Sequence, residues 1–219
     1  MKGSIQADPS VGFQAGDTAI FRITVTNPAG GNATAFDFDI IDESDELLSF
    51  VAIDGASPNN PGIPTGGTPS GGKRTYTWAS ASGDMPSSLA PGASYVFDAQ
   101  FLLGAVSPLQ NLENQAQVTW TSQSGANVNE RTGTDTDTGG QNDYYDEQSI
   151  FISTGNIEFR KRLVGTQTNF NVGQELSFEL SMDPLAGINR RVRFVDHLPA
   201  GLTYAVSYTH LRAHETVVH

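Results

Sequence analysis

Two stretches of the chain, Ala15–Asp42 and Val172–Asp196, share a pattern in which apolar and polar residues alternate. When the stretches are aligned on Gly16 and Gly173, their apolar positions coincide: Ala19, Phe21, Ile23 and Val25 in the first, and Leu176, Phe178, Leu180 and Met182 in the second. A period of two predicts a strand with one face on a core and one in water. In each stretch a second apolar run follows and ends at an aspartate, Asp42 or Asp196. The sequence therefore predicts tandem β units.

Between these repeats the chain alternates short apolar runs with turn signals. We expect further strands at Leu47–Ile53, Lys73–Ala79, Ser94–Leu102, Gln115–Ser122 and Tyr144–Ile152. The segments Ala56–Gly72 and Gln123–Asp143 are rich in turn-forming and polar residues and are predicted to be loops. No stretch has a helical apolar period. About seven strands separated by turns indicate an all-β, immunoglobulin-like β-sandwich.

The pattern also predicts domain boundaries. Residues 1–155 form a first unit, whose first strand is expected to be shortened or missing. Residues 156–205 hold only the opening strands of a second unit, expected at Asn156–Leu163, Glu175–Met182 and Arg191–Val195. Residues 206–219 break the alternation and carry three of the four histidines, so we interpret them as a non-native tail. The alternative is a genuine strand continuing from Tyr204.

Composition narrows the possible partners. The net charge of −12 argues against nucleic acid or an anionic membrane as a partner, because both require a basic surface. The absence of cysteine excludes disulfides and thiolate chemistry. No apolar run approaches the ~20 residues of a membrane-spanning helix, so membrane insertion is not expected. The N-terminus has no apolar signal-peptide core, and Met1–Gly3 is interpreted as a cut or added start.

Several motifs resemble a known family. GDTAIFRITVTN and VGQELSFELSMD are similar to its characteristic second strand, FVDHLPAGLTY to its "V-x-D-x-LP-x-GLT-Y" segment, and the segments Leu89–Gly92 and Asn114–Ser122 to its later strands. The family is that of the bacterial cell-surface repeats known as domain of unknown function eleven, which overlaps with the isopeptide-forming, Cna-B-like repeats. The resemblance covers Ala15–Ser122 and Asn156–Tyr204. It implies an immunoglobulin-like sandwich, repeated along an extracellular or cell-surface protein.

The resemblance also raises the question of an internal cross-link. Some family members join a first-strand lysine to a last-strand asparagine, with a buried acid as catalyst. Lys161 stands where that lysine would be in unit 2, but the last strand is missing there, and Lys161 can equally be a solvated strand residue. In unit 1, Asn114 is the candidate asparagine, but its lysine is missing because Lys2 is judged too close to Gly16. No isopeptide bond is therefore expected in this chain.

Two acidic clusters suggest calcium as a possible cofactor. In the first, Asp135, Asp137, Asn142 and Asp143 lie on a glycine-rich segment and could direct several oxygen ligands at one ion. The second consists of Asp37 and Asp39 on the outward face of a strand and Asp42, Glu43, Asp45 and Glu46 in the turn after it. Solvated surface acids are the alternative interpretation in both cases.

Nothing in the sequence favours catalysis. His197 is the only histidine before residue 206 and is interpreted as a turn residue, since no serine lies in a nucleophile motif. Trp78, Trp120, Tyr95 and Phe101 fall on inward strand positions and are predicted core residues. The sequence thus predicts a structural or adhesive repeat that contacts neighbouring units of its parent chain, with the host or matrix ligand unidentified. The alternative is a carbohydrate- or protein-binding module that acts through its loops.

Overall fold

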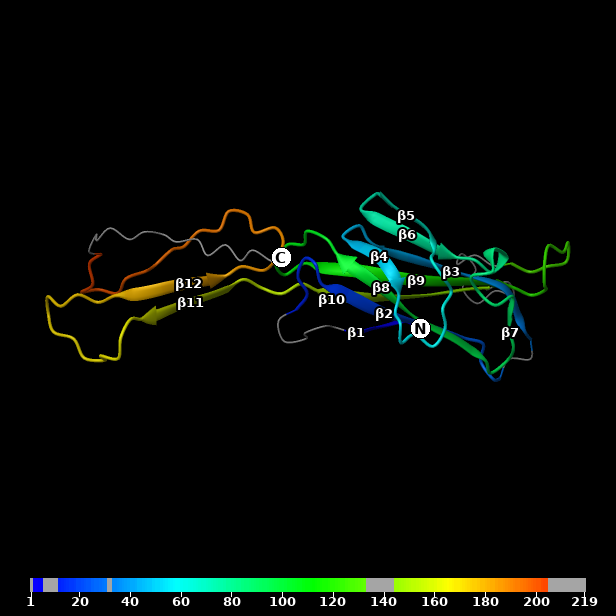
Figure 1. Cartoon of the computed structure of the whole chain (residues 1–219), viewed down its shortest axis with the longest axis horizontal. Helices are drawn as coiled ribbons and strands as arrows, with labels where there is room; N and C mark the ends of the chain where they lie inside the picture. The colour runs from blue at the N-terminus through cyan, green and yellow to red at the C-terminus, as the bar shows by residue number, and fades with distance from the viewer. Residues whose placement is uncertain (1, 6–11, 31–32, 133–143, 205–219) are drawn as a thin grey trace. The chain divides into compact units, whose positions relative to one another are not determined.

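The computed structural model describes residues 2–5, 12–30, 33–132 and 144–204 (Figure 1). By their contacts these residues divide into two units. Unit 1 consists of Met1–Glu158 with Asp183–Asn189, and unit 2 of Phe159–Met182 with Arg190–His219. Within the described residues the only helical element is the 3-10 turn Ser80–Ser82, and no helix is long and apolar enough to span a membrane.

Unit 1 is a sandwich of two antiparallel sheets. The first has the strand order β1 (Lys2–Ile5), β2 (Thr18–Thr26), β8 (Ser94–Leu103), β4 (Leu48–Ile53). The second has the order β10 (Tyr145–Ser153), β9 (Asn111–Thr121), β3 (Ala35–Asp45), β6 (Lys73–Trp78), β5 (Thr65–Ser70), and β7 (Ser88–Leu89) pairs with β3. The chain therefore has the all-β, immunoglobulin-like fold that its turn and strand signals predict.

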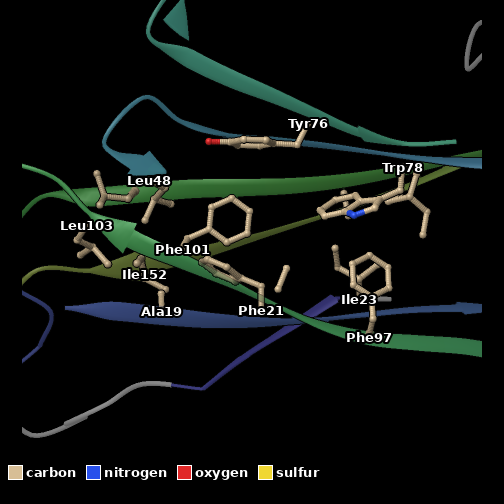
Figure 2. Packing of buried hydrophobic residues seen from close by; sticks show 14 of the residues in the cluster. Ala19, Phe21, Ile23, Leu48, Tyr76, Trp78, Phe97, Phe101, Leu103 and Ile152 are labelled. Atoms are coloured by element: carbon tan, nitrogen blue, oxygen red, sulfur yellow. The ribbon is translucent and has the colours of Figure 1, made fainter. Parts of the chain in front are cut away.

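The core lies between the inward faces of these sheets. Alternate residues of β2 and β8 are fully buried, as the period-two pattern requires. Figure 2 shows them facing side chains of the second sheet. The largest fully buried side chains are Trp78, Phe13, Phe21, Phe38, Phe97 and Phe101. Their rings make edge contacts, such as Trp78 with Phe97 at 5.0 Å between centroids, so aromatic burial supplies much of the hydrophobic stabilisation.

One hydrogen bond of the core links the two sheets directly. The backbone N–H of Phe50 in β4 donates to the hydroxyl of Tyr76 in β6, at 2.9 Å. The pairing of β4 with β8 shifts register between Phe50 and Ala52, which marks a β-bulge. Because Tyr76 is only 6 % exposed, its hydroxyl satisfies a donor of the bulged strand in a region with little access to water.

The first strand, expected to be shortened or missing, is the four-residue β1, whose residues Lys2–Ile5 pair with Ile23–Ile20 of β2. The strand expectations need correction in two places. β5 forms inside the predicted loop Ala56–Gly72 because its glycines allow a close approach to β6: a Cβ on Gly67 would lie 2.6 Å from the Tyr76 ring. Arg191–Val195 does not form a strand.

Unit 2 contains a two-stranded sheet of β11 (Glu158–Leu163) and β12 (Phe178–Asp183). The Phe159 and Phe194 rings lie 5.4 Å apart, but both side chains remain about half exposed. Lys161 Nζ is 2.6 Å from Asp196 Oδ1 and lies over the Phe178 ring. Two strands bury little apolar area, so the unit gains little of the hydrophobic stabilisation available to unit 1.

Candidate functional site: a buried Asp–Asn pair and an open groove

The predicted calcium residues fall into two groups. Asp135, Asp137, Asn142 and Asp143 lie outside the described residues. In the second cluster, three of the carboxylates accept hydrogen bonds from different parts of unit 1. Asp37 accepts from the Gly125 N–H, Asp39 from the Ser80 N–H and hydroxyl, and Asp45 from the Leu47 N–H. Among the described residues, no three His, Asp or Glu side chains lie close enough together to hold a metal ion.

Asp42 is not in a turn, as its sequence position suggested, but is buried within β3. β3 extends to Asp45, and its pattern of burial continues through Asp42 and Ser44, both fully buried. Asn114 of β9 is also fully buried, and its Nδ2 donates to Asp42 Oδ1 at 2.8 Å. The sequence identified Asn114 but not the aspartate that it contacts. The missed signal was the alternation itself, because Phe38, Ile40, Asp42 and Ser44 share one face of the strand.

The Asp42–Asn114 pair has an unusual feature. The other amide atom of Asn114, Oδ1, is buried and has no hydrogen-bond partner within the part of the chain that the structure describes. A buried acceptor without a donor costs about 1–3 kcal/mol, and a catalytic role is one of the reasons for which native proteins keep such a group. The pair is therefore the strongest candidate for chemistry in unit 1.

A cross-link at Asn114 would require a lysine, so the contacts of each lysine matter here. Lys73 is bound to Glu113 at 2.9 Å. Lys161 is bound to Asp196, which takes the place of Asp42 in the second repeat. The sequence places Lys2 too close to Gly16 for it to be the first-strand lysine of unit 1. The structure corrects this point, because Lys2 begins β1, and β1 pairs with β2.

His197, the histidine considered for catalysis, is exposed. Of the four aromatic residues predicted to be core, Trp78 and Phe101 are fully buried, whereas Tyr95 and Trp120 are only partly buried. Burial raises the pKa of the Tyr95 phenol, and the nearby Asp84 carboxylate adds to the effect.

The partial exposure of Trp120 reflects an open groove at one end of the sandwich. The groove has a volume of about 530 Å³ and lies between the inward faces of β2, β3 and β9. Its apolar wall includes Val25, Phe38, Val118 and Trp120. A smaller hollow with Ala116, Glu147 and Gln148 in its lining shares Val25 and Val118 with it. The two hollows are therefore neighbours.

The outer face of the first sheet carries a different polar arrangement. The Arg22 guanidinium contacts both carboxylate oxygens of Asp98, at 2.8 and 2.9 Å, and these residues are directly opposite each other on β2 and β8. The bonds to Asp98 raise the pKa of Arg22. Asp98 N–H also donates to Ser57 Oγ at 2.9 Å, so the loop after β4 covers this pair.

Comparison with protein-family models and with curated proteins yields no match. Three solved structures are similar to the chain at low identity. They are the fimbrial adhesin FimA of Actinomyces (15% identity, TM-score 0.36, 74% of this chain and 57% of that one), domains D2 and D3 of the major pilin SpaD of Corynebacterium diphtheriae (16%, 0.39, 74% and 54%), and AvmM, which catalyses macrocyclisation in alchivemycin A biosynthesis (12%, 0.41, 78% and 92%). The chain spans somewhat more than half the length of the first two.

Proposed function

We propose that this chain is a non-catalytic structural or adhesive module, acting as a stalk or spacer in a large secreted or surface-anchored bacterial protein. The observation that carries the proposal is the repeat. The alternating pattern that builds β2 and β3 in unit 1 returns at residues 172–196, with the same period of two and again with a final aspartate. A protein that repeats a sandwich gains length by adding units, and neighbouring units of the parent chain are its first partners.

The architecture of unit 1 supports a rigid spacer. Its core is continuous from β2 and β8 to β3, β6 and β9, and the Phe50–Tyr76 hydrogen bond joins the two sheets. Interiors packed in this way resist deformation. A module of this kind holds its two ends at a fixed separation, which is the physical requirement for a stalk.

The separation of the two ends of β9 tests the proposal. The chain has no cysteine, so Ala105→Cys and Val128→Cys, both at exposed positions, allow selective spin labelling. We expect pulsed electron resonance to give one narrow distance distribution. It should not change when glycans or matrix proteins are added. A broad or ligand-dependent distribution would argue for a binding module whose shape responds to its ligand.

The buried pair offers this module a site for a covalent brace. Asp42 and Asn114 join β3 to β9 inside the core, and the unpartnered Asn114 Oδ1 lacks a donor among the described residues. In the reaction suggested by the family resemblance, a lysine Nζ attacks Asn114 Cγ. An Nζ–Cγ amide forms, the Cγ–Nδ2 bond breaks, and ammonia leaves. The Asp42 carboxyl would relay the proton. Such a bond would lock two strands together without adding any surface contact.

A further inference from the structure

One edge of β8 is longer than the strand that pairs with it. On the other edge, β2 pairs with β8 from Leu102 to Ser94, whereas the pairing with β4 ends where Ile53 lies opposite Ala99. Among the described residues, no strand pairs with residues 94–98 on the side away from β2. These residues therefore form a short stretch of edge that no neighbouring strand fills.

The segment that follows β4, residues 54–60, covers this stretch, and we call it the strap. Ser57 Oγ accepts a hydrogen bond from the Asp98 N–H at 2.9 Å. Asn59 Nδ2 donates to the Val96 carbonyl at 2.7 Å. Two polar side chains thus take hydrogen-bonding places that the backbone of a neighbouring strand would otherwise fill.

The strap is held mainly by polar contacts. Its first residue, Asp54, donates its backbone N–H to the Asp98 carbonyl at 2.8 Å. The Asp54 carboxylate accepts from the Ala56 N–H at 2.9 Å and from the Gln100 side chain. No residue of the strap is fully buried. Segments with little apolar burial open at a lower free energy than the core, so the strap can be displaced while the sandwich stays folded.

The covered stretch is complementary to a second copy of itself. Val96 and Asp98 direct backbone groups at this edge, and by the alternation of strand hydrogen bonds Ser94 does so too. When two copies pair antiparallel about Val96, each Ser94 lies opposite Asp98 of the other copy, and the two Asp98 carboxylates stay apart. β4 does not block this register, because its pairing with β8 reaches only to Ala99. An unpaired strand edge is a template for pairing with another chain.

We propose that residues 94–98 are a surface for self-association, and that the strap controls access to it. With the strap in place, β8 offers no free edge there. When the strap is displaced, this stretch pairs with the same stretch of a second copy, and the first sheets of the two copies join into one continuous sheet. The same patch is used on both copies, so the product is a two-fold symmetric dimer and not a filament. The proposal does not depend on the spacer role.

Two variants of the full-length chain test it. Ser57→Ala with Asn59→Ala removes both side-chain hydrogen bonds to β8 and keeps the length of the strap. Asn60→Ala is the matched control, because the Asn60 side chain accepts from the Gly62 N–H and makes no hydrogen bond to β8 within the described residues. Analytical ultracentrifugation measures the mass in solution, and hydrogen exchange at the Asp98 amide reports on the edge itself.

In dilute solution the Asp98 amide of the double variant should exchange at least about fivefold faster than that of the wild type, because it has lost its acceptor. At high concentration the double variant should form dimers, and the same amide should become protected again. The wild type and Asn60→Ala should show neither change. Association through exposed apolar side chains of unit 2, such as Phe159, would instead raise the mass of all three proteins alike.

If the double variant does not fold, Ser57→Ala alone answers the same question, because it frees the Asp98 N–H and keeps the bond from Asn59. Three results would overturn the proposal. The first is that the Asp98 amide exchanges no faster than in the wild type. The second is that the variant and the wild type have equal masses at every concentration. The third is that the variant associates while its Asp98 amide stays unprotected.

Discussion

The hydrogen bond from the Phe50 N–H to the Tyr76 hydroxyl gives a sharp stability prediction. Tyr76→Phe removes one oxygen atom and keeps the ring, which packs on Phe50 at 5.9 Å and on Phe101 at 5.6 Å between centroids. The backbone N–H of Phe50 then loses its acceptor at a position with little access to water. Leaving such a donor unsatisfied costs about 1–3 kcal/mol, so we expect the free energy of unfolding to fall by that amount.

Urea unfolding measures this change in unit 1 alone. Both tryptophans of the chain, Trp78 and Trp120, lie in unit 1, so their fluorescence reports on this unit. With a denaturant slope of about 2 kcal/mol per molar urea, the expected loss moves the midpoint down by roughly 0.5–1.5 M. The slope itself should not change. The Phe50 amide should also exchange faster with solvent, because it has lost its hydrogen bond.

Tyr95→Phe is the matched control. The Tyr95 ring packs on Phe38 and Phe97, but its hydroxyl makes no hydrogen bond within the described residues. Removing that hydroxyl should change the free energy of unfolding by less than about 0.5 kcal/mol. If Tyr76→Phe costs no more than Tyr95→Phe, then the bond between the sheets contributes nothing measurable and the reasoning fails.

Three further predictions concern covalent chemistry, pH and calcium. The intact mass tests the covalent brace: an isopeptide bond at Asn114 would make the mass of the wild-type chain lower than the sequence mass by one ammonia, whereas Asn114→Ala would keep the full mass of its sequence. An undiminished wild-type mass would rule the bond out. The hydrogen bond from Lys73 lowers the pKa of Glu113 below its usual 4.5, so its contribution to stability is present above pH 4.5 and is lost as the pH falls through the lowered value. Urea midpoints across that range should fall less steeply for Glu113→Gln. The calcium hypothesis for residues 135–143 predicts a higher Tm in calcium than in chelator, because calcium at 100 times its Kd would raise the free energy of unfolding by about 2.7 kcal/mol. Equal Tm values would favour the interpretation of these acids as solvated residues.

Alternation along the strands predicted most of the fold. The strands around Phe21, Trp78 and Phe97 were expected from the sequence alone, because each places aromatic or branched residues on one face at a period of two. β5 could not be found in this way. Its sequence, TGGTPS, has no apolar face, and it forms a strand because its glycines fit against the Tyr76 ring. That contact involves a residue on another strand, which a local pattern does not contain.

The candidate site was only half predictable for a related reason. Asn114 was recognised from a motif, but Asp42 was assigned to a turn because it lies among other acids. A charged residue at the end of an apolar run usually marks the end of a strand. Here the strand continues, and the inward phase of β3 carries Asp42 and Ser44 into the core. The groove could not be predicted, because its walls come from β2, β3 and β9, which are far apart in the sequence.

The bridge between Phe13 and Thr154 joins segments near the start and the end of unit 1, where a pulling force along the chain would act. It is a parallel bridge, with hydrogen bonds from the Phe13 N–H to the Ser153 carbonyl at 3.1 Å and from the Gly155 N–H to the Phe13 carbonyl at 3.0 Å. When two parallel segments are pulled from the start of one and the end of the other, their hydrogen bonds are loaded along the strands. They must then break together instead of one after another. A Cβ on Gly12 would lie 2.6 Å from the Gly155 nitrogen. Glycine at this position therefore allows the two segments to come close enough for both hydrogen bonds to form.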